Sequence, residues 1–188
     1  TCHPAPGWPG SPDRSAAIPA MIADFCGTAG ADDFDVSGTA VSYQGSDEGY
    51  RRMVLHYALL AKAAGGVDAF LIGSELRGLT TLRDEADGFP FVSALADLAA
   101  DARAILGAST KITYGADWSE YFGHHPADGS GDVFFHLDPL WAHPAIDAVG
   151  IDNYMPLSDW RDADLENVNP DGFRLADDGE AMAAQITA

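Results

Sequence analysis

The chain has 188 residues, enough for one domain with a sizeable core, and 47% of them are hydrophobic, which excludes a disordered protein. Ten Lys and Arg against 29 Asp and Glu give a formal net charge of −19. Such a charge repels phosphate backbones and anionic lipid surfaces, so we expect no nucleic-acid partner and no membrane insertion.

The N-terminal part is predicted to hold two helices. Residues 1–14 are rich in Pro and Gly, which is typical of a loop. Apolar residues at helical spacing predict a helix over 15–26 and a clearer one over 46–64. The segment between them, 28–46, is predicted to be loop with at most a short strand at 41–43.

Three short apolar runs are predicted to be buried strands, and they cover residues 67–73, 111–117 and 146–152. A helix is predicted over 90–106, and a short helix or turn over 136–144. The rest of the chain is predicted to be an acidic loop with a weak helix at its end.

This alternation of helices and strands predicts an α/β fold with a parallel sheet and right-handed crossovers. A barrel places successive strands side by side in sequence order, whereas a doubly wound sheet has a point where neighbours in sequence part. No glycine-rich phosphate-binding motif follows any of the three strands, which disfavours the nucleotide-binding versions of the fold.

Polar and aromatic residues follow each predicted strand, where the functional groups of parallel sheets collect. We predict Glu75 as a catalytic general acid/base in a barrel mouth whose rim partly shields it from water. The alternative is that Glu75 caps the next turn or pairs with Arg77. Aromatic rings that stack on sugars and polar groups that bond hydroxyls predict a substrate-binding set: Ser74, Asp117, Trp118, Tyr121, Asp152, Asn153 and Tyr154.

Three histidines, His124, His125 and His136, fall close together beside several aspartates. Their spacing matches no known metal-ligand pattern, so the sequence predicts no metal site and no cofactor. A metal-dependent hydrolase built on these histidines is the alternative. Residues 128–133 are predicted to be an ordinary turn, because the positions expected for Gly and Glu in a calcium loop hold Val133 and Pro139.

Three segments, residues 1–13, 70–83 and 111–162, resemble one family. It is the TIM-barrel-like domain of the large tail protein of gene transfer agents, which are phage-like particles of alphaproteobacteria, and of related prophage tails. The resemblance implies a host-specificity role in the tail of a virion-like particle that is assembled in the bacterial cytoplasm and then released. The implied partners are other tail proteins and a cell-envelope polysaccharide.

That domain is similar to the barrel clan of retaining glycoside hydrolases, whose acid/base Glu follows strand four as Gly-x-Glu. Gly73-Ser74-Glu75 matches this motif. The resemblance implies a partial (β/α)8 TIM barrel, approximately strands four to six with flanking helices, in which 1–188 is a single-domain fragment of a longer tail protein. The implied nucleophile Glu, after strand seven, would lie beyond Ala188, so we expect the isolated chain to lack glycosidase activity. The alternative function is a catalytically inactive structural or receptor-binding module of the tail.

Overall fold

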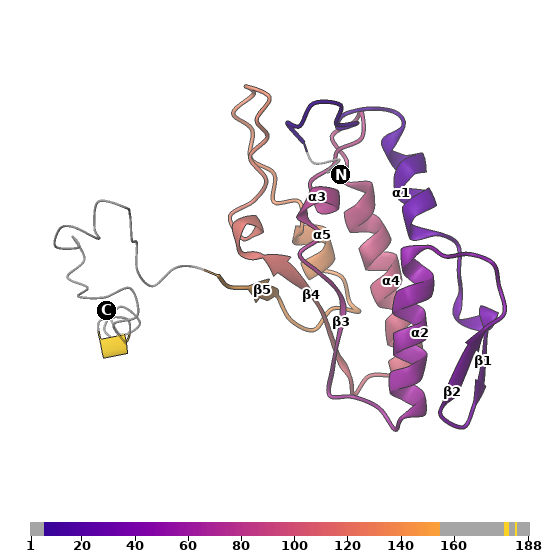
Figure 1. Cartoon of the computed structure of the whole chain (residues 1–188). Coiled ribbons are helices and arrows are strands. Elements are labelled where there is room, and N and C mark those ends of the chain that lie inside the picture. Colours follow the sequence, from indigo (N-terminus) through magenta and orange to yellow (C-terminus); the bar gives the residue numbers. More distant parts are fainter. Residues whose placement is uncertain (1–5, 155–178, 181–182, 184–188) are drawn as a thin grey trace. The chain divides into compact units, whose positions relative to one another are not determined.

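The computed structural model describes residues 6–154, 179–180 and 183 of the chain (Figure 1). Contacts divide the chain into two units, Thr1–Asp152 and Asn153–Ala188. Every element discussed below belongs to the first unit, and most of the acidic segment predicted after residue 152 lies outside the described residues. Among the described residues, no helix combines the length and the apolar character that a membrane crossing requires.

The centre of the first unit is a three-stranded sheet whose order along the sheet is the order along the chain. β3 pairs with β4, and β4 pairs with β5, both in parallel. The prediction of adjacent parallel strands is confirmed, and the sheet has the strand order of a partial TIM barrel without closing into one. The strands are β3 (Ala69–Ser74), β4 (Lys111–Asp117) and β5 (Gly150–Asp152).

Helices cover one face of this sheet (Figure 1). The helices α2 and α4 contact the strands, and α1 packs against both of them. Alternating β3 and β4 residues point into this layer, so Ile72, Ile112 and Tyr114 are fully buried. Each such side chain contributes about 1.5–3 kcal/mol by leaving water. The long helices are α1 (Ile18–Cys26), α2 (Tyr50–Ala63) and α4 (Pro90–Leu106).

The helix α4 has the bounds that its sequence predicts. Pro90 occupies the first turn, where a missing N–H group is harmless, and Gly107 ends the helix at a φ of 81°. The apolar side chains of this helix form its buried face: Phe91, Val92, Leu95, Leu98, Ala99, Ala102 and Ile105.

The helix α2 begins four residues later than predicted. The carboxylate of Asp47 accepts hydrogen bonds from the backbone N–H groups of Thr28, Ala29 and Gly49, which holds this stretch as a loop. The loop passes close to the end of α1, because a Cβ atom on Gly49 would lie 2.5 Å from the carbonyl oxygen of Cys26.

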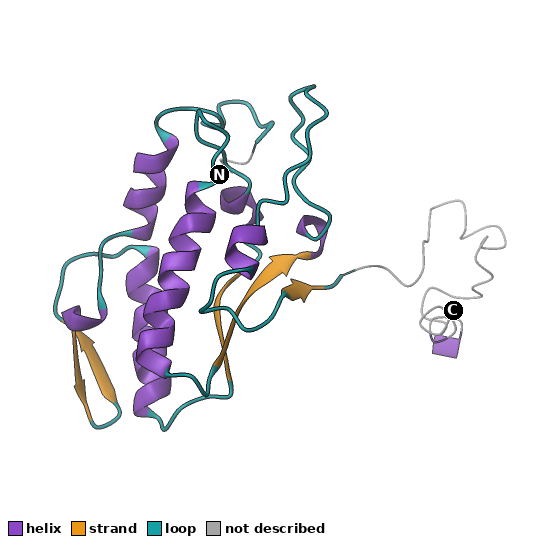
Figure 2. Cartoon of the chain, turned by 180° about the vertical axis from the view of Figure 1, so that it is seen from behind, coloured by secondary structure: helices purple, strands orange, loops and turns teal. Residues whose placement is uncertain are grey.

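A hairpin formed by β1 (Phe34–Ser37) and β2 (Ala40–Tyr43) corrects the prediction of a mostly loop segment over 28–46. Its strands are antiparallel, and Figure 2 shows the helices standing between this hairpin and the three-stranded sheet. Only Phe34 of β1 is buried, where its ring packs against that of Tyr43. A strand with one buried residue does not need alternating apolar residues, so its sequence carries little of the pattern that predicts a strand.

Short helical turns connect the remaining strands. The strand β5 begins at Gly150 and is therefore shorter than predicted. Asp147, which precedes it, exchanges hydrogen bonds with the backbone of Ile112 through its N–H group and its carboxylate, and this carboxylate also binds Arg103. These side-chain contacts replace the regular backbone pairing with β4 at this position. The short elements are η1 (Ala31–Asp33), α3 (Arg77–Thr80), η2 (Trp118–Glu120) and α5 (Asp138–Trp141).

Candidate functional site

The C-terminal ends of the three strands form one edge of the sheet, because all of the strands are parallel. β3 ends at Ser74, β4 at Asp117 and β5 at Asp152. Glu75 is the first residue after β3, and its N–H group donates a 2.8 Å hydrogen bond to the carbonyl oxygen of Gly115 in β4. The structure therefore places Glu75 at this edge, as the sequence predicts.

Glu75 adopts a left-handed backbone conformation with a φ of 54°. For a residue with a side chain this conformation costs about 1–2 kcal/mol, and such strain gathers at functional sites. The side chain of Glu75 is exposed, so the described residues do not give it the shielding rim that we predict from the sequence. It makes no ion pair with Arg77 and no cap for α3 within the described residues, which removes both alternatives for this residue.

We expect Glu75→Gly to raise the free energy of unfolding by about 0.5–1 kcal/mol, because glycine adopts a positive φ without steric strain. Glu85→Gly is the matched control, since Glu85 is exposed and has no positive φ, and it should lower that free energy. Urea denaturation of both variants measures the difference, and destabilisation by both would mean that Glu75 is not strained.

Ser74 and Asp152 meet across the middle strand. The Ser74 hydroxyl donates a 2.5 Å hydrogen bond to Asp152 Oδ2, although β4 separates β3 from β5. Neighbouring strands lie about 4.8 Å apart, so this contact needs an empty position between the two side chains. Gly115 provides that position on the sheet face opposite the helices, and it is the residue paired with Ser74.

We expect Gly115→Ala to separate this pair and to lower the free energy of unfolding by about 1–2 kcal/mol. The added Cβ atom would lie 2.8 Å from Asp152 Oδ2 and 3.1 Å from Ser74 Oγ. Thermal unfolding of Gly115→Ala alone and together with Asp152→Ala tests the cause. If Gly115→Ala lowers the free energy of unfolding by the same amount when Asp152 is already Ala, the added methyl group does not clash with Asp152.

Asp117 caps the turn η2 that follows β4. Its Oδ1 atom accepts hydrogen bonds from both the N–H group and the hydroxyl of Ser119, and these bonds lower the pKa of Asp117. The capped turn presents the ring of Trp118, which is 36% exposed, and Tyr121 follows it at 56%. The candidate edge therefore carries a fixed carboxylate beside two accessible aromatic rings.

Glu120 is a buried structural residue that is not among the residues predicted for the site. It accepts hydrogen bonds from the Thr80 hydroxyl and from the N–H group of Asp117, and it lies 3.3 Å from His136 Nε2. The signal was present, because Asp117 and Glu120 have the spacing of a capping box at the start of a helical turn. These contacts fix the end of β4 and leave no oxygen of Glu120 facing the edge.

The histidines do not gather into a metal site. His124 and His136 are buried, with ring centroids 5.9 Å apart, whereas His125 is exposed. Among the described residues, no group of three or more His, Cys, Asp or Glu side chains is placed to hold a metal ion. The predicted turn over 128–133 carries instead Asp128, which binds the buried guanidinium of Arg83 at 3.0 Å.

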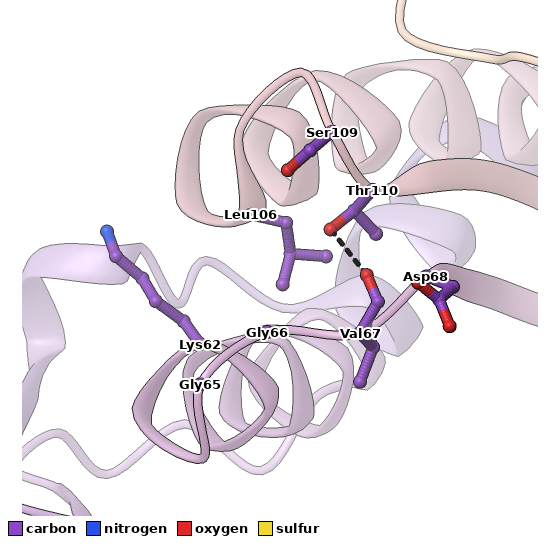
Figure 3. Close-up of a pocket in the computed structure, with 8 residues that line it drawn as sticks. All are labelled: Lys62, Gly65, Gly66, Val67, Asp68, Leu106, Ser109 and Thr110. Atoms are coloured by element: carbon purple, nitrogen blue, oxygen red, sulfur yellow. Dashed lines mark hydrogen bonds between the residues drawn. The ribbon is translucent and has the colours of Figure 1, made fainter.

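Two large cavities lie at opposite edges of the sheet. One, of about 440 Å³, adjoins Glu75 and is lined by Trp8, Arg77, His124 and His125, among others. The other, of about 500 Å³, is lined by residues that precede β3 and β4 and by the end of α2 (Figure 3).

The residues that line the cavity at the N-terminal edge connect the starts of two strands. Thr110 donates a 2.9 Å hydrogen bond to the carbonyl oxygen of Val67, which ties the starts of β4 and β3 together (Figure 3). The side chain of Lys62 extends away from this pair (Figure 3). In parallel barrels the N-terminal edge serves stability and the C-terminal edge carries the chemistry, so the cavity beside Glu75 is the candidate site.

A family model described as the GTA TIM-barrel-like domain matches residues 48–188. The chain belongs to this family. The matched residues of this GTA TIM-barrel-like domain include all three strands of the sheet, and with them Glu75, Asp117 and Asp152. No curated protein matches the chain.

Two predicted substrate-binding residues of the GTA TIM-barrel-like domain, Asn153 and Tyr154, begin the second contact unit. Both side chains are exposed, and both follow directly on β5 in the chain. The other predicted residues at this edge divide into two groups: Glu75, Trp118 and Tyr121 are exposed, whereas Ser74, Asp117 and Asp152 make hydrogen bonds within the chain.

Proposed function

We propose that this GTA TIM-barrel-like domain acts on or binds a cell-envelope polysaccharide, with Glu75 as the acid/base residue. We further propose that it works in the tail of a phage-like particle, beside other tail proteins. The observation that supports a role for Glu75 is its strained backbone at the end of a strand, combined with a side chain that is exposed and unpaired among the described residues. Residues held in strained backbone conformations cluster at functional sites, and Glu75 differs from the other two residues of positive φ, Arg14 and Asp87, which form an ion pair with each other.

Glycoside hydrolysis by retention needs one carboxyl group to protonate the leaving oxygen and a second, about 5–5.5 Å away, to attack the sugar. Glu75 suits the first role. Trp118 and Tyr121 offer ring faces to pyranose C–H groups, and the Ser74–Asp152 pair offers hydrogen-bonding groups to hydroxyls. These groups lie along one edge, as a polysaccharide chain requires.

A catalytically inactive receptor-binding module is the second candidate. It is favoured by the contacts of two other carboxylates near this edge: Asp117 caps η2, and Glu120 is buried against Thr80 and His136. Neither is placed as a free nucleophile. The edge would then bind sugars through the same rings without cleaving them.

Assays on peptidoglycan and on aryl glycosides distinguish these functions. If the 188-residue chain is a glycosidase, we expect Glu75→Gln to reduce turnover by about 10²–10⁴-fold, the usual contribution of a general acid. Glu85→Gln, which removes the same charge from an exposed position, should leave turnover unchanged. Saccharide binding without turnover, lost in Trp118→Ala, would favour the receptor-binding module. Absence of both binding and turnover would contradict the proposed function.

A further inference from the structure

The cavity beside Glu75 is lined by a cation, Arg77, that forms no ion pair among the described residues, although its charge helps to lower the pKa of Asp117. Of the Lys and Arg side chains that the structure describes, five form ion pairs and Arg52 stacks over the ring of Tyr43. Arg77 does neither. Arg77 lines the cavity in a chain whose formal net charge is −19, and most of the cations that the structure describes have an acidic partner.

The other lining groups fit a sugar. The cavity volume of about 440 Å³ is in the range of small-ligand sites, and Trp8 is 62% exposed at its wall. His124 and His125 add ring nitrogens, and His124 Nε2 is buried without a hydrogen-bond partner in the described chain. A flat apolar ring beside polar nitrogens and a guanidinium is a setting for a sugar ring that carries an acidic group.

The overall charge explains why one local arginine matters. At physiological salt, two exposed charges more than about 8–10 Å apart are largely screened from each other. Acidic residues at that distance from the cavity therefore repel an anionic ligand in it only weakly. A guanidinium binds a carboxylate through two parallel hydrogen bonds, which gives both direction and affinity at short range. An anionic ligand in this cavity would therefore depend on Arg77, the cation that lines it.

We propose that this cavity is a subsite for a sugar bearing a carboxylate, in which Arg77 binds the carboxylate and Trp8 stacks on the ring. The inference rests on the proposed polysaccharide function and adds the substrate class to it. The carboxylate can belong to the lactyl ether of a muramic acid or to a uronic acid, because both present the same group.

Calorimetric titration of the 188-residue chain tests this subsite with matched sugars. The disaccharide of N-acetylglucosamine and N-acetylmuramic acid differs from N,N′-diacetylchitobiose by the lactyl carboxylate, and an aryl β-glucuronide differs from the aryl β-glucoside by a uronate. We expect at least about tenfold tighter binding of the acidic member in one pair, which names the source of the carboxylate.

Arg77→Gln should remove this preference and leave the affinity for the neutral sugar unchanged. Arg52→Gln removes the same charge away from the cavity and should keep the preference. Trp8→Ala should weaken acidic and neutral sugars by the same factor. Equal binding of acidic and neutral sugars, or a preference that survives in Arg77→Gln, overturns the subsite and leaves the proposed function standing. No binding of any of these sugars overturns both.

Discussion

Replacing Arg83 with Met is expected to lower the free energy of unfolding by about 3–5 kcal/mol, because it leaves carboxylates without their buried partner. Arg83 is 2% exposed, and its guanidinium binds Asp13 at 2.6 Å and Asp128 at 3.0 Å. It also lies over the ring of Phe134, 5.6 Å from the centroid. One side chain thereby ties together the N-terminal loop and the loop after β4, and residues of both loops line the cavity beside Glu75.

The control is Lys111→Met, which removes a cation whose side chain is 68% exposed beside Asp147. An exposed pair contributes about 0–1 kcal/mol, so we expect only a small change. Adding Asp13→Asn and Asp128→Asn to Arg83→Met should restore most of the lost stability, because the two closest carboxylates are then neutral and Asp87, the third partner of Arg83, keeps its ion pair with Arg14. Urea denaturation measures all of these variants. A loss for Arg83→Met no larger than that for Lys111→Met would contradict the assignment of Arg83 as the tie between these loops.

The elements that the sequence predicts best are those whose signals are local. The helix α4 combines a proline in its first turn, a seven-residue apolar face and a terminal glycine, and its bounds agree with the prediction. The strand β4 is a short, mostly apolar run that begins after a loop and ends at the capping residue Asp117, and its bounds also agree with the prediction. The position of Glu75 at a strand end follows from the same rule, since parallel strands share one edge.

The parts that the sequence does not predict depend on contacts between distant segments. Asp13, Arg83 and Asp128 are separated by many residues, and nothing in the spacing of Arg83 shows that it is buried. The contact of Ser74 with Asp152 depends on a glycine in a third segment, Gly115. Binary pattern and local propensity describe single elements, so such pairings appear only when the elements are packed.

Lowering the pH from about 7 to about 4.5 is expected to remove about 2–3 kcal/mol of stability through His124 alone. Its side chain is 8% exposed, and its ring packs against those of Phe89, Phe134 and His136. Burial lowers the pKa of His124 from 6.5 to about 4, and the neighbouring His136 and Arg83 add to this effect. The folded chain therefore keeps this imidazole neutral at pH values where the unfolded chain protonates it.

The sign follows from the two pKa values of His124. Between about 6.5 and about 4 the unfolded state binds the proton more readily, so protonation favours unfolding, and the loss is complete below the folded value. His124→Phe keeps an aromatic ring in this cluster and cannot take up the proton, so its stability should change less with pH over this window. The carboxylates of Asp117 and Asp128, whose pKa values are lowered from 3.8, titrate mainly below it and contribute equally to both proteins. His125→Phe is the control for an exposed ring. Urea denaturation at both pH values measures the difference, and an identical pH dependence for the unchanged chain and His124→Phe would show that His124 is not held neutral by the fold.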